Sequence, residues 1–170
     1  MMTYTSAQAS KLLRKLSDEY DALLNREEKS REFHAAMGED VESVRPEYDY
    51  EKTQDELNKL ENKIRRLKHA IHQFNITHPV PGFDMTIDEM LIYIPQLTRK
   101  KNKLAEMKSK LPKARVEERL GRQSNIIDYI HINYDLSAVE ADFGRVSDEL
   151  SNAQIALDIV NTTDTFELDF

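Results

Sequence analysis

Two segments of this chain repeat the spacing of a coiled coil, and this pattern constrains the fold more than any other feature of the sequence. In each segment eight seam positions follow one another at steps of three and four residues: Tyr50, Thr53, Leu57, Leu60, Ile64, Leu67, Ile71 and Phe74 in the first, and Leu136, Val139, Phe143, Val146, Leu150, Ala153, Leu157 and Val160 in the second. A stripe this narrow is typical of a long helix that packs against another helix. We therefore expect coiled-coil helices over residues 49–75 and 136–161, paired antiparallel.

The composition agrees with long helices and excludes several other classes. Only 4 of the 170 residues are Gly, which disfavours a turn-rich β-sandwich or barrel, and the absence of Cys excludes disulfides, thiol catalysis and Cys-ligated metals. The hydrophobic share of 39% is low for a compact globule but sufficient for narrow seams. We expect the chain to bury the rest of its apolar surface as a homo-oligomer.

The remaining segments complete a mainly α fold, which we interpret as one helical domain over residues 1–170. The expected elements are a helix at 6–36, a loop at 37–48, a basic helix at 86–111, a β-hairpin at 114–134 with its turn at 121–124, and an acidic tail at 162–170. The hairpin is predicted from the alternating β-branched and aromatic residues that precede Tyr134.

Local signals predict where the helices begin. Ser6 is placed to cap the first helix. Capping boxes are predicted from Thr86 to Glu89 and from Ser137 to Glu140, because each pair of side chains can bond the other's backbone N–H group. Pro95 lies inside the basic helix, and we expect it to kink that helix or divide it into two.

The net charge of −7 conceals an asymmetry along the chain. Residues 127–170 contain ten acidic residues and one basic residue, whereas residues 99–115 contain eight basic residues and one acidic residue. The overall charge and a sequence pI near 5.3 oppose binding of an extended nucleic acid. A small anion needs only two or three converging cations, so the basic helix is either a solvated face or part of an anion site.

Nothing in the sequence indicates catalysis. It contains no Gly-x-Ser-x-Gly elbow, phosphate-binding Gly loop or dinucleotide-binding Gly motif. His69 and His72 could share a helix face, but a metal site would need a further ligand. We expect no cofactor, no metal and no enzymatic activity. Because no apolar run is long enough for a membrane span and the N-terminal residues do not read as a secretory signal, we expect a cytoplasmic location.

Four features in order resemble the septicolysin-like family of small, mostly uncharacterised bacterial and phage proteins. They are a heptad helix ending in Asn75-Ile76-Thr77-His78, a helix start at Gly82-Phe83-Asp84-Met85-Thr86, a basic helix leading into a hairpin, and a C-terminal heptad helix ending near Asn161. The resemblance covers residues 50–170. It implies a helical oligomer with a small β element and little about activity.

The candidate ligand-binding residues are the cations of two helices together with polar and aromatic neighbours. They are Arg65, Arg66, Lys68, Asn75, Thr77, His78, Tyr93, Arg99, Lys100 and Lys103. The two sets of cations would converge if their helices packed antiparallel. Asn75, Thr77 and His78 have a second interpretation, in which they terminate the helix and turn the chain.

Three functions are consistent with these residues. The first is a non-enzymatic helical oligomer that binds a small anionic ligand such as a nucleotide, sequestering a cyclic nucleotide signal as a phage anti-defence protein would. The second is a coiled-coil structural or protein-interaction module without a small ligand. The third is a metal-assisted hydrolase that uses His69, His72 and carboxylates. The ligand-binding function predicts two kinds of partner, which are further copies of the chain and a small anion. It excludes binding to extended nucleic acid and to membranes.

Overall fold

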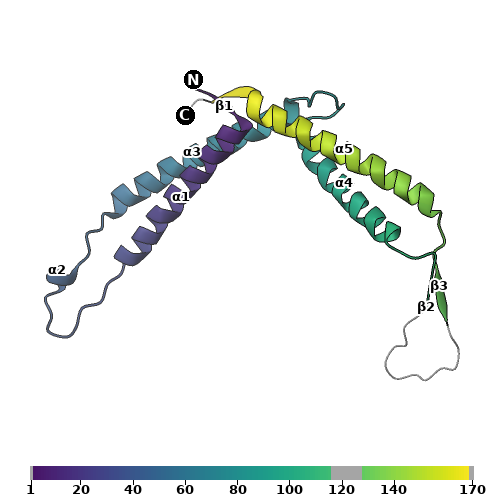
Figure 1. Ribbon diagram of the computed structural model, residues 1–170. Coiled ribbons are helices and arrows are strands. Elements are labelled where there is room, and N and C mark those ends of the chain that lie inside the picture. Colours follow the sequence, from purple (N-terminus) through teal and green to yellow (C-terminus); the bar gives the residue numbers. More distant parts are fainter. Residues whose placement is uncertain (1, 116–127, 169–170) are drawn as a thin grey trace. The chain divides into compact units, whose positions relative to one another are not determined.

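The computed structural model of the chain describes residues 2–115 and 128–168, which are mainly helical (Figure 1). In chain order the elements are β1 (Met2–Thr5), α1 (Ser6–Ser30), α2 (Val41–Val44), α3 (Tyr50–Thr77), α4 (Ile87–Lys108), β2 (Lys113–Arg115), β3 (Tyr129–His131), α5 (Leu136–Thr163) and β4 (Thr165–Leu168). The predicted mainly α fold with a small antiparallel β element is confirmed. The turn expected at 121–124 lies outside the described residues.

The chain, for which we expected one helical domain over residues 1–170, forms two compact units. The first unit consists of Met1–His78 and Asp158–Phe170, and the second consists of Pro79–Leu157. The second unit is therefore inserted between the two parts of the first in the order of the chain.

In the first unit, α1 covers the predicted seam of α3. Tyr20 contacts Glu61, whereas Arg26, further along α1, contacts Glu56, which precedes Glu61 in α3, so the two helices run antiparallel. Leu67 of the seam is fully buried. We expected helix 136–161 to cover this seam, and that pairing is wrong. The apolar stripe of α1 has the same helical spacing, and neighbours in sequence are usually neighbours in space.

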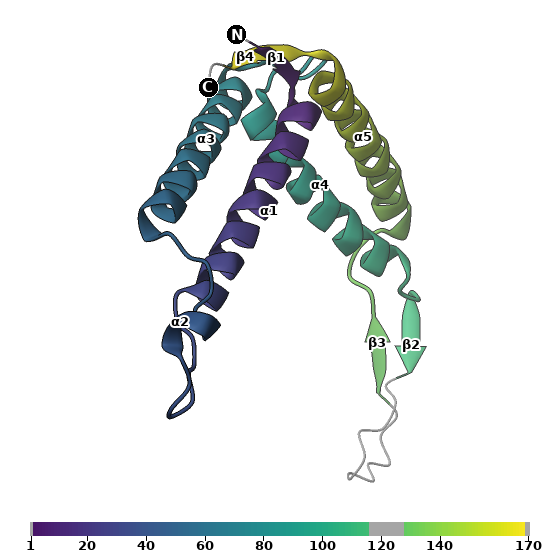
Figure 2. The ribbon, with the colours of Figure 1, turned by 90° about the vertical axis from the view of Figure 1, so that its left-hand side faces the viewer.

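A two-stranded antiparallel sheet closes one end of the first unit. β1 pairs with β4 in a register that joins Met2 to Leu168 and Thr5 to Thr165, and Figure 2 shows the two strands side by side near the chain ends. Leu168 is 4% exposed and belongs to the core cluster that includes Ala9, Leu16 and Leu67. The segment that we expected to be a tail therefore contributes a strand to the core.

The second unit is built from α4 and α5. The Tyr93 hydroxyl donates a hydrogen bond to the Glu149 carboxylate. The two helices bury the side chains Met90, Leu97, Leu104, Val139, Val146, Leu150 and Ala153. The predicted seam of the C-terminal helix is thus buried, with α4 as its partner. α4 runs unbroken through Pro95, so the division of this helix that we considered does not occur.

Two of the three predicted helix starts are shifted by one or two residues. Thr5, not Ser6, caps α1, and its side chain forms a capping box with Gln8. α5 is capped by Asp135, whose carboxylate accepts from the backbone N–H of Ser137 at 2.9 Å, so the capping box predicted at Ser137 is wrong. The Thr86 capping box is present as predicted.

Candidate functional site

The predicted site residues fall into two sets. Arg65, Arg66, Lys68, Asn75, Thr77 and His78 belong to the first unit, and Tyr93, Arg99, Lys100 and Lys103 belong to the second. We expected the two groups of cations to converge through antiparallel packing of their helices. Instead α3 packs on α1, and α4 packs on α5. Each set is therefore described within its own unit.

A groove between α1 and α3 contains two of the predicted cations. Its volume is about 460 Å³, and it is lined by Ser17, Tyr20, Asp21, Glu61, Ile64, Arg65 and Lys68. We call this the Tyr20 groove. α1 supplies an aromatic ring and α3 supplies the guanidinium and ammonium groups, because these side chains flank the seam that holds the two helices together. Volumes of this order are typical of small-molecule sites.

The polar side chains of the Tyr20 groove are partly organised. The Tyr20 hydroxyl donates to Glu61 Oε1 at 2.7 Å, and this hydrogen bond raises the pKa of the Tyr20 phenol. The Arg65 guanidinium donates to Asn62 Oδ1 at 3.0 Å. Among the described residues neither Arg65 nor Lys68 forms a salt bridge. Both cations therefore keep donors for an anion.

Tyr20 and Glu61 were not among the predicted site residues. Tyr20 reads in the sequence as one more apolar position of the first helix, and Glu61 reads as a charge beside the seam. Only the pairing of α1 with α3 brings them to the same groove as Arg65. Tyr20 and Glu61 could have been identified from the sequence if the helix that packs against residues 49–75 had been known.

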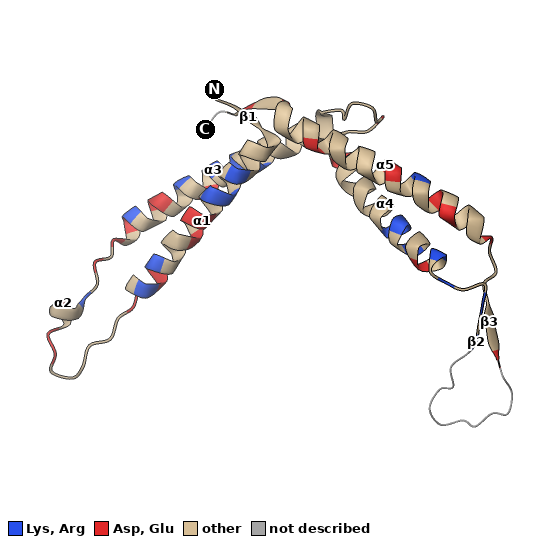
Figure 3. Cartoon of the chain, viewed as in Figure 1, with Lys and Arg blue, Asp and Glu red and all other residues tan. Residues whose placement is uncertain are grey.

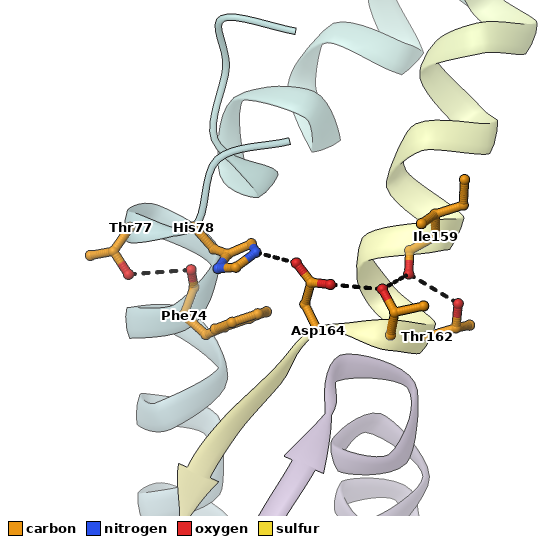
Figure 4. A network of polar contacts seen from close by, with 7 residues as sticks. Phe74, Thr77, His78, Ile159, Thr162 and Asp164 are labelled. Carbon is orange, nitrogen blue, oxygen red and sulfur yellow. Dashed lines mark hydrogen bonds and ion pairs between the residues drawn. The ribbon is translucent and has the colours of Figure 1, made fainter. Parts of the chain in front are cut away.

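At the end of α3, the His78 side chain is hydrogen-bonded to the Asp164 carboxylate. His78 Nε2 lies 2.6 Å from Asp164 Oδ2, and the His78 ring stacks on Phe74 with 4.4 Å between centroids (Figure 4). Phe74 in turn stacks on Phe166 of β4. The Thr163 hydroxyl and then His78 lower the pKa of the Asp164 carboxyl. This arrangement joins the ends of α3 and α5 within the first unit.

The neighbouring residues also act on the backbone. The Thr77 hydroxyl donates to the Gln73 carbonyl at 2.8 Å, and the His78 N–H donates to the Phe74 carbonyl at 2.9 Å. The His78 bond satisfies the Phe74 carbonyl, one of those that the end of a helix would otherwise leave without a partner. Asn75 is half-buried beside them. These contacts favour the second interpretation of the segment, in which it terminates α3 and turns the chain.

The cations of α4 differ in what they contact. Arg99, Lys100 and Lys103 are exposed, whereas the ammonium groups of Lys101 and Lys108 lie 5.9 and 5.1 Å from the centre of the Phe143 ring. Figure 3 shows the Lys and Arg residues gathered on the second half of α4, and Asp and Glu residues along α5. Tyr93 of the predicted site bonds Glu149, so its hydroxyl holds the helix pair together.

The described residues offer no arrangement for metal chemistry or membrane insertion. Within 2–115 and 128–168 no three His, Asp or Glu side chains are grouped so as to hold a metal ion, and both His69 and His72 are exposed on α3. Nor does any helix in this part of the chain combine the length and the apolar character that a membrane span requires.

Comparisons with known proteins provide a fold but no function. Neither protein-family models nor curated proteins match the sequence, so the septicolysin-like resemblance stays a prediction. One solved structure, described as that of a functionally unknown conserved protein from Corynebacterium diphtheriae, is similar over 98% of this chain and 100% of that chain, with a TM-score of 0.60 and 15% identity. At this identity the likeness shows that the two chains share a fold and nothing further.

Proposed function

We propose that this chain is a non-catalytic helical protein that binds a small anionic ligand, such as a nucleotide, in the Tyr20 groove. The observation that carries the proposal is the presence of Tyr20, Arg65 and Lys68 around one groove of about 460 Å³. A guanidinium and an ammonium group suit the oxygens of a phosphate, and a Tyr ring offers a surface on which a base can stack.

The acidic residues of the groove are consistent with such a ligand. Asp21 and Glu61 line it together with the cations. Their oxygens accept hydrogen bonds from the amino and hydroxyl groups that a nucleoside carries, whereas inorganic phosphate offers only its P–OH groups. The groove therefore favours a nucleotide over a simple anion. Sequestration of a cyclic nucleotide signal is the role that we propose for it.

The proposal is tested with the purified full-length chain and a panel of mono-, di- and cyclic dinucleotides. We expect at least one of them to raise the melting temperature, to bind in calorimetry, and to be recovered chemically intact after the protein is denatured by heat. Charge-assisted hydrogen bonds contribute about 1.5–3 kcal/mol each, so the loss of two in R65A/K68A is expected to weaken binding by about a hundredfold or more. Y20L removes the ring, and Y20F retains it.

A matched control lies on the other flank of the same helix pair. Lys59 and Lys63 line a separate groove with Leu23 and Leu60. K59A/K63A removes the same number of charges from the same helix, and we expect it to bind the ligand like the wild type. Absence of any response across the panel, or equal loss in both double variants, would contradict the proposal. A ligand recovered as a hydrolysed product would indicate an enzyme instead.

A further inference from the structure

The second unit has one basic outer face and one acidic outer face. On α4, Ile92, Arg99 and Lys103 are spaced to point away from the α4–α5 seam. Glu106 falls on the same side, and its carboxylate is paired with Lys110 at 3.7 Å. On α5, the corresponding stripe on the side opposite its seam contains Glu140, Gly144, Asp148, Ser151 and Ile155. We call these stripes the α4 outer face and the α5 outer face.

The charges of these faces have no partners inside the described part of the chain. No salt bridge among residues 2–115 and 128–168 includes Arg99, Lys103, Glu140 or Asp148. Each face also exposes a large apolar side chain, because Ile92 is 58% exposed and Ile155 is 56% exposed. An apolar residue beside unpaired charges of one sign suits a partner surface of the opposite sign.

The α5 outer face is also shaped to receive a long side chain. A groove of about 790 Å³ on this face is lined by Phe83, Gly144, Arg145, Asp148, Glu149 and Asn152. The Arg145 guanidinium is paired with Asp142 at 2.6 Å, whereas Asp148 forms no salt bridge among the described residues. A Cβ atom built on Gly144 would have nothing within 4 Å, so the backbone there is open to an approaching group. A guanidinium entering at Gly144 would meet the carboxylate of Asp148.

The register of α4 against α5 shows which residues lie level with one another. Tyr93 bonds Glu149 near one end of the helix pair, and Lys113 pairs with His131 in the hairpin beyond the other end. Between these two anchors each step forward along α4 corresponds to one step back along α5. Arg99 is therefore level with residues 143–145, and Lys103 is level with residues 139–141.

We propose that a second copy of this chain docks the α5 outer face of its second unit against the α4 outer face of the first copy, in the same orientation and register. Lys103 then meets Glu140 of the other copy, and Arg99 enters the groove formed by Gly144 and Asp148. The contact joins two different surfaces, so it leaves one free outer face at each end of a pair. Such a head-to-tail contact between copies of the same orientation continues into a row of copies, and it does not stop at a symmetric dimer.

Charge-reversal variants test this contact in a way that also identifies its two sides. R99E/K103E makes both outer faces acidic, and E140K/D148K makes both basic. We expect the wild type to show masses above that of one chain by native mass spectrometry and light scattering at low salt, and lower masses at high salt. Each variant alone should be monomeric. An equimolar mixture of the two should assemble again, since each acidic face then meets a basic one.

The control is K11E/K15E on α1 in the first unit. Each reversal changes the charge by two, so K11E/K15E and R99E/K103E both move the net charge from −7 to −11. We expect K11E/K15E to assemble like the wild type. Unchanged melting temperatures of all variants establish that the charge reversals have not unfolded the chain.

Several results would overturn the proposal. If the wild type is monomeric at low salt, the α4 and α5 outer faces do not bind another copy of this chain. Assembly of R99E/K103E or E140K/D148K alone, or a mixture that remains monomeric, would place the contact elsewhere. Loss of assembly in K11E/K15E would show that net charge, rather than these faces, controls it. None of these results depends on the Tyr20 groove, which lies in the first unit.

Discussion

Replacing Leu67 by Ala is expected to destabilise the first unit more than any exposed substitution in its helices. Leu67 is a seam position of α3 with 0% exposure, and it packs in one cluster with Ala9, Leu16 and Leu168. Leu→Ala removes three carbon atoms, which at about 0.8 kcal/mol each corresponds to roughly 2.4 kcal/mol of lost burial. The cavity that remains adds to this cost, so we expect a loss of about 3–4 kcal/mol.

The loss is measured by urea unfolding followed by far-UV circular dichroism. L24A provides the control, because Leu24 lies on α1 and is 38% exposed. Its replacement is expected to cost no more than about 1 kcal/mol, since the site is partly hydrated already. If the urea midpoint falls while the slope of the unfolding free energy against urea concentration stays the same, the substitution acts on the stability of the native state and not on the unfolded state.

The comparison of the two variants can refute the reasoning. If L67A loses less than about 1 kcal/mol, or no more than L24A, the helices α1 and α3 do not close over this position. The cluster that joins the helix pair to β4 would then not be the core of the first unit. A large loss in L67A and a small one in L24A supports both the pairing of α1 with α3 and the position of Leu168.

Three further substitutions test other parts of the fold. D164N removes the carboxylate that pairs with His78. Because the pKa of Asp164 is lowered in the folded state, its stabilising effect is present above the unfolded value of 3.8 and is lost as pH falls through the folded value. The difference in melting temperature between wild type and variant should therefore start to shrink only below pH 3.8 in acid melts. T5A removes the side chain that caps α1 and forms the capping box with Gln8. It should lower the free energy of unfolding, measured in urea titrations, by about 1 kcal/mol. An unchanged free energy of unfolding would show that Thr5 does not cap α1. Gly82 has a φ of +85°, so G82A should cost about 1 kcal/mol although its Cβ meets nothing, and an unchanged melting temperature would argue against this turn.

The sequence predicted the helices well because their signal is local and repeated. Seam residues such as Leu67, Val146 and Leu150 follow one period over eight successive seam positions in each helix, and all three are buried. The same pattern contains no information about which seam faces which. Narrow apolar stripes of equal spacing are nearly interchangeable, so the pairing of α3 with α1 depends on chain connection and side-chain fit.

The β1–β4 sheet and the Tyr20 groove could not be predicted for a related reason. Met2–Thr5 is too short to show a period, and its partner strand lies at the other end of the numbering. The groove likewise depends on Tyr20 and Arg65 from helices whose pairing was not predicted. By contrast, the capping box at Thr86 was predicted correctly, because both of its side chains lie within one turn.

The pairing of β1 with β4 has a consequence for the order in which the chain folds as it is synthesised. β1, α1 and α3 leave the ribosome early, but Leu168 of their core and the strand that pairs with β1 emerge after the whole second unit. The second unit can complete its α4–α5 core first, because it is continuous in sequence. The first unit must hold an unpaired strand edge until its last segment returns, which makes it the slower and more aggregation-exposed part of the nascent chain.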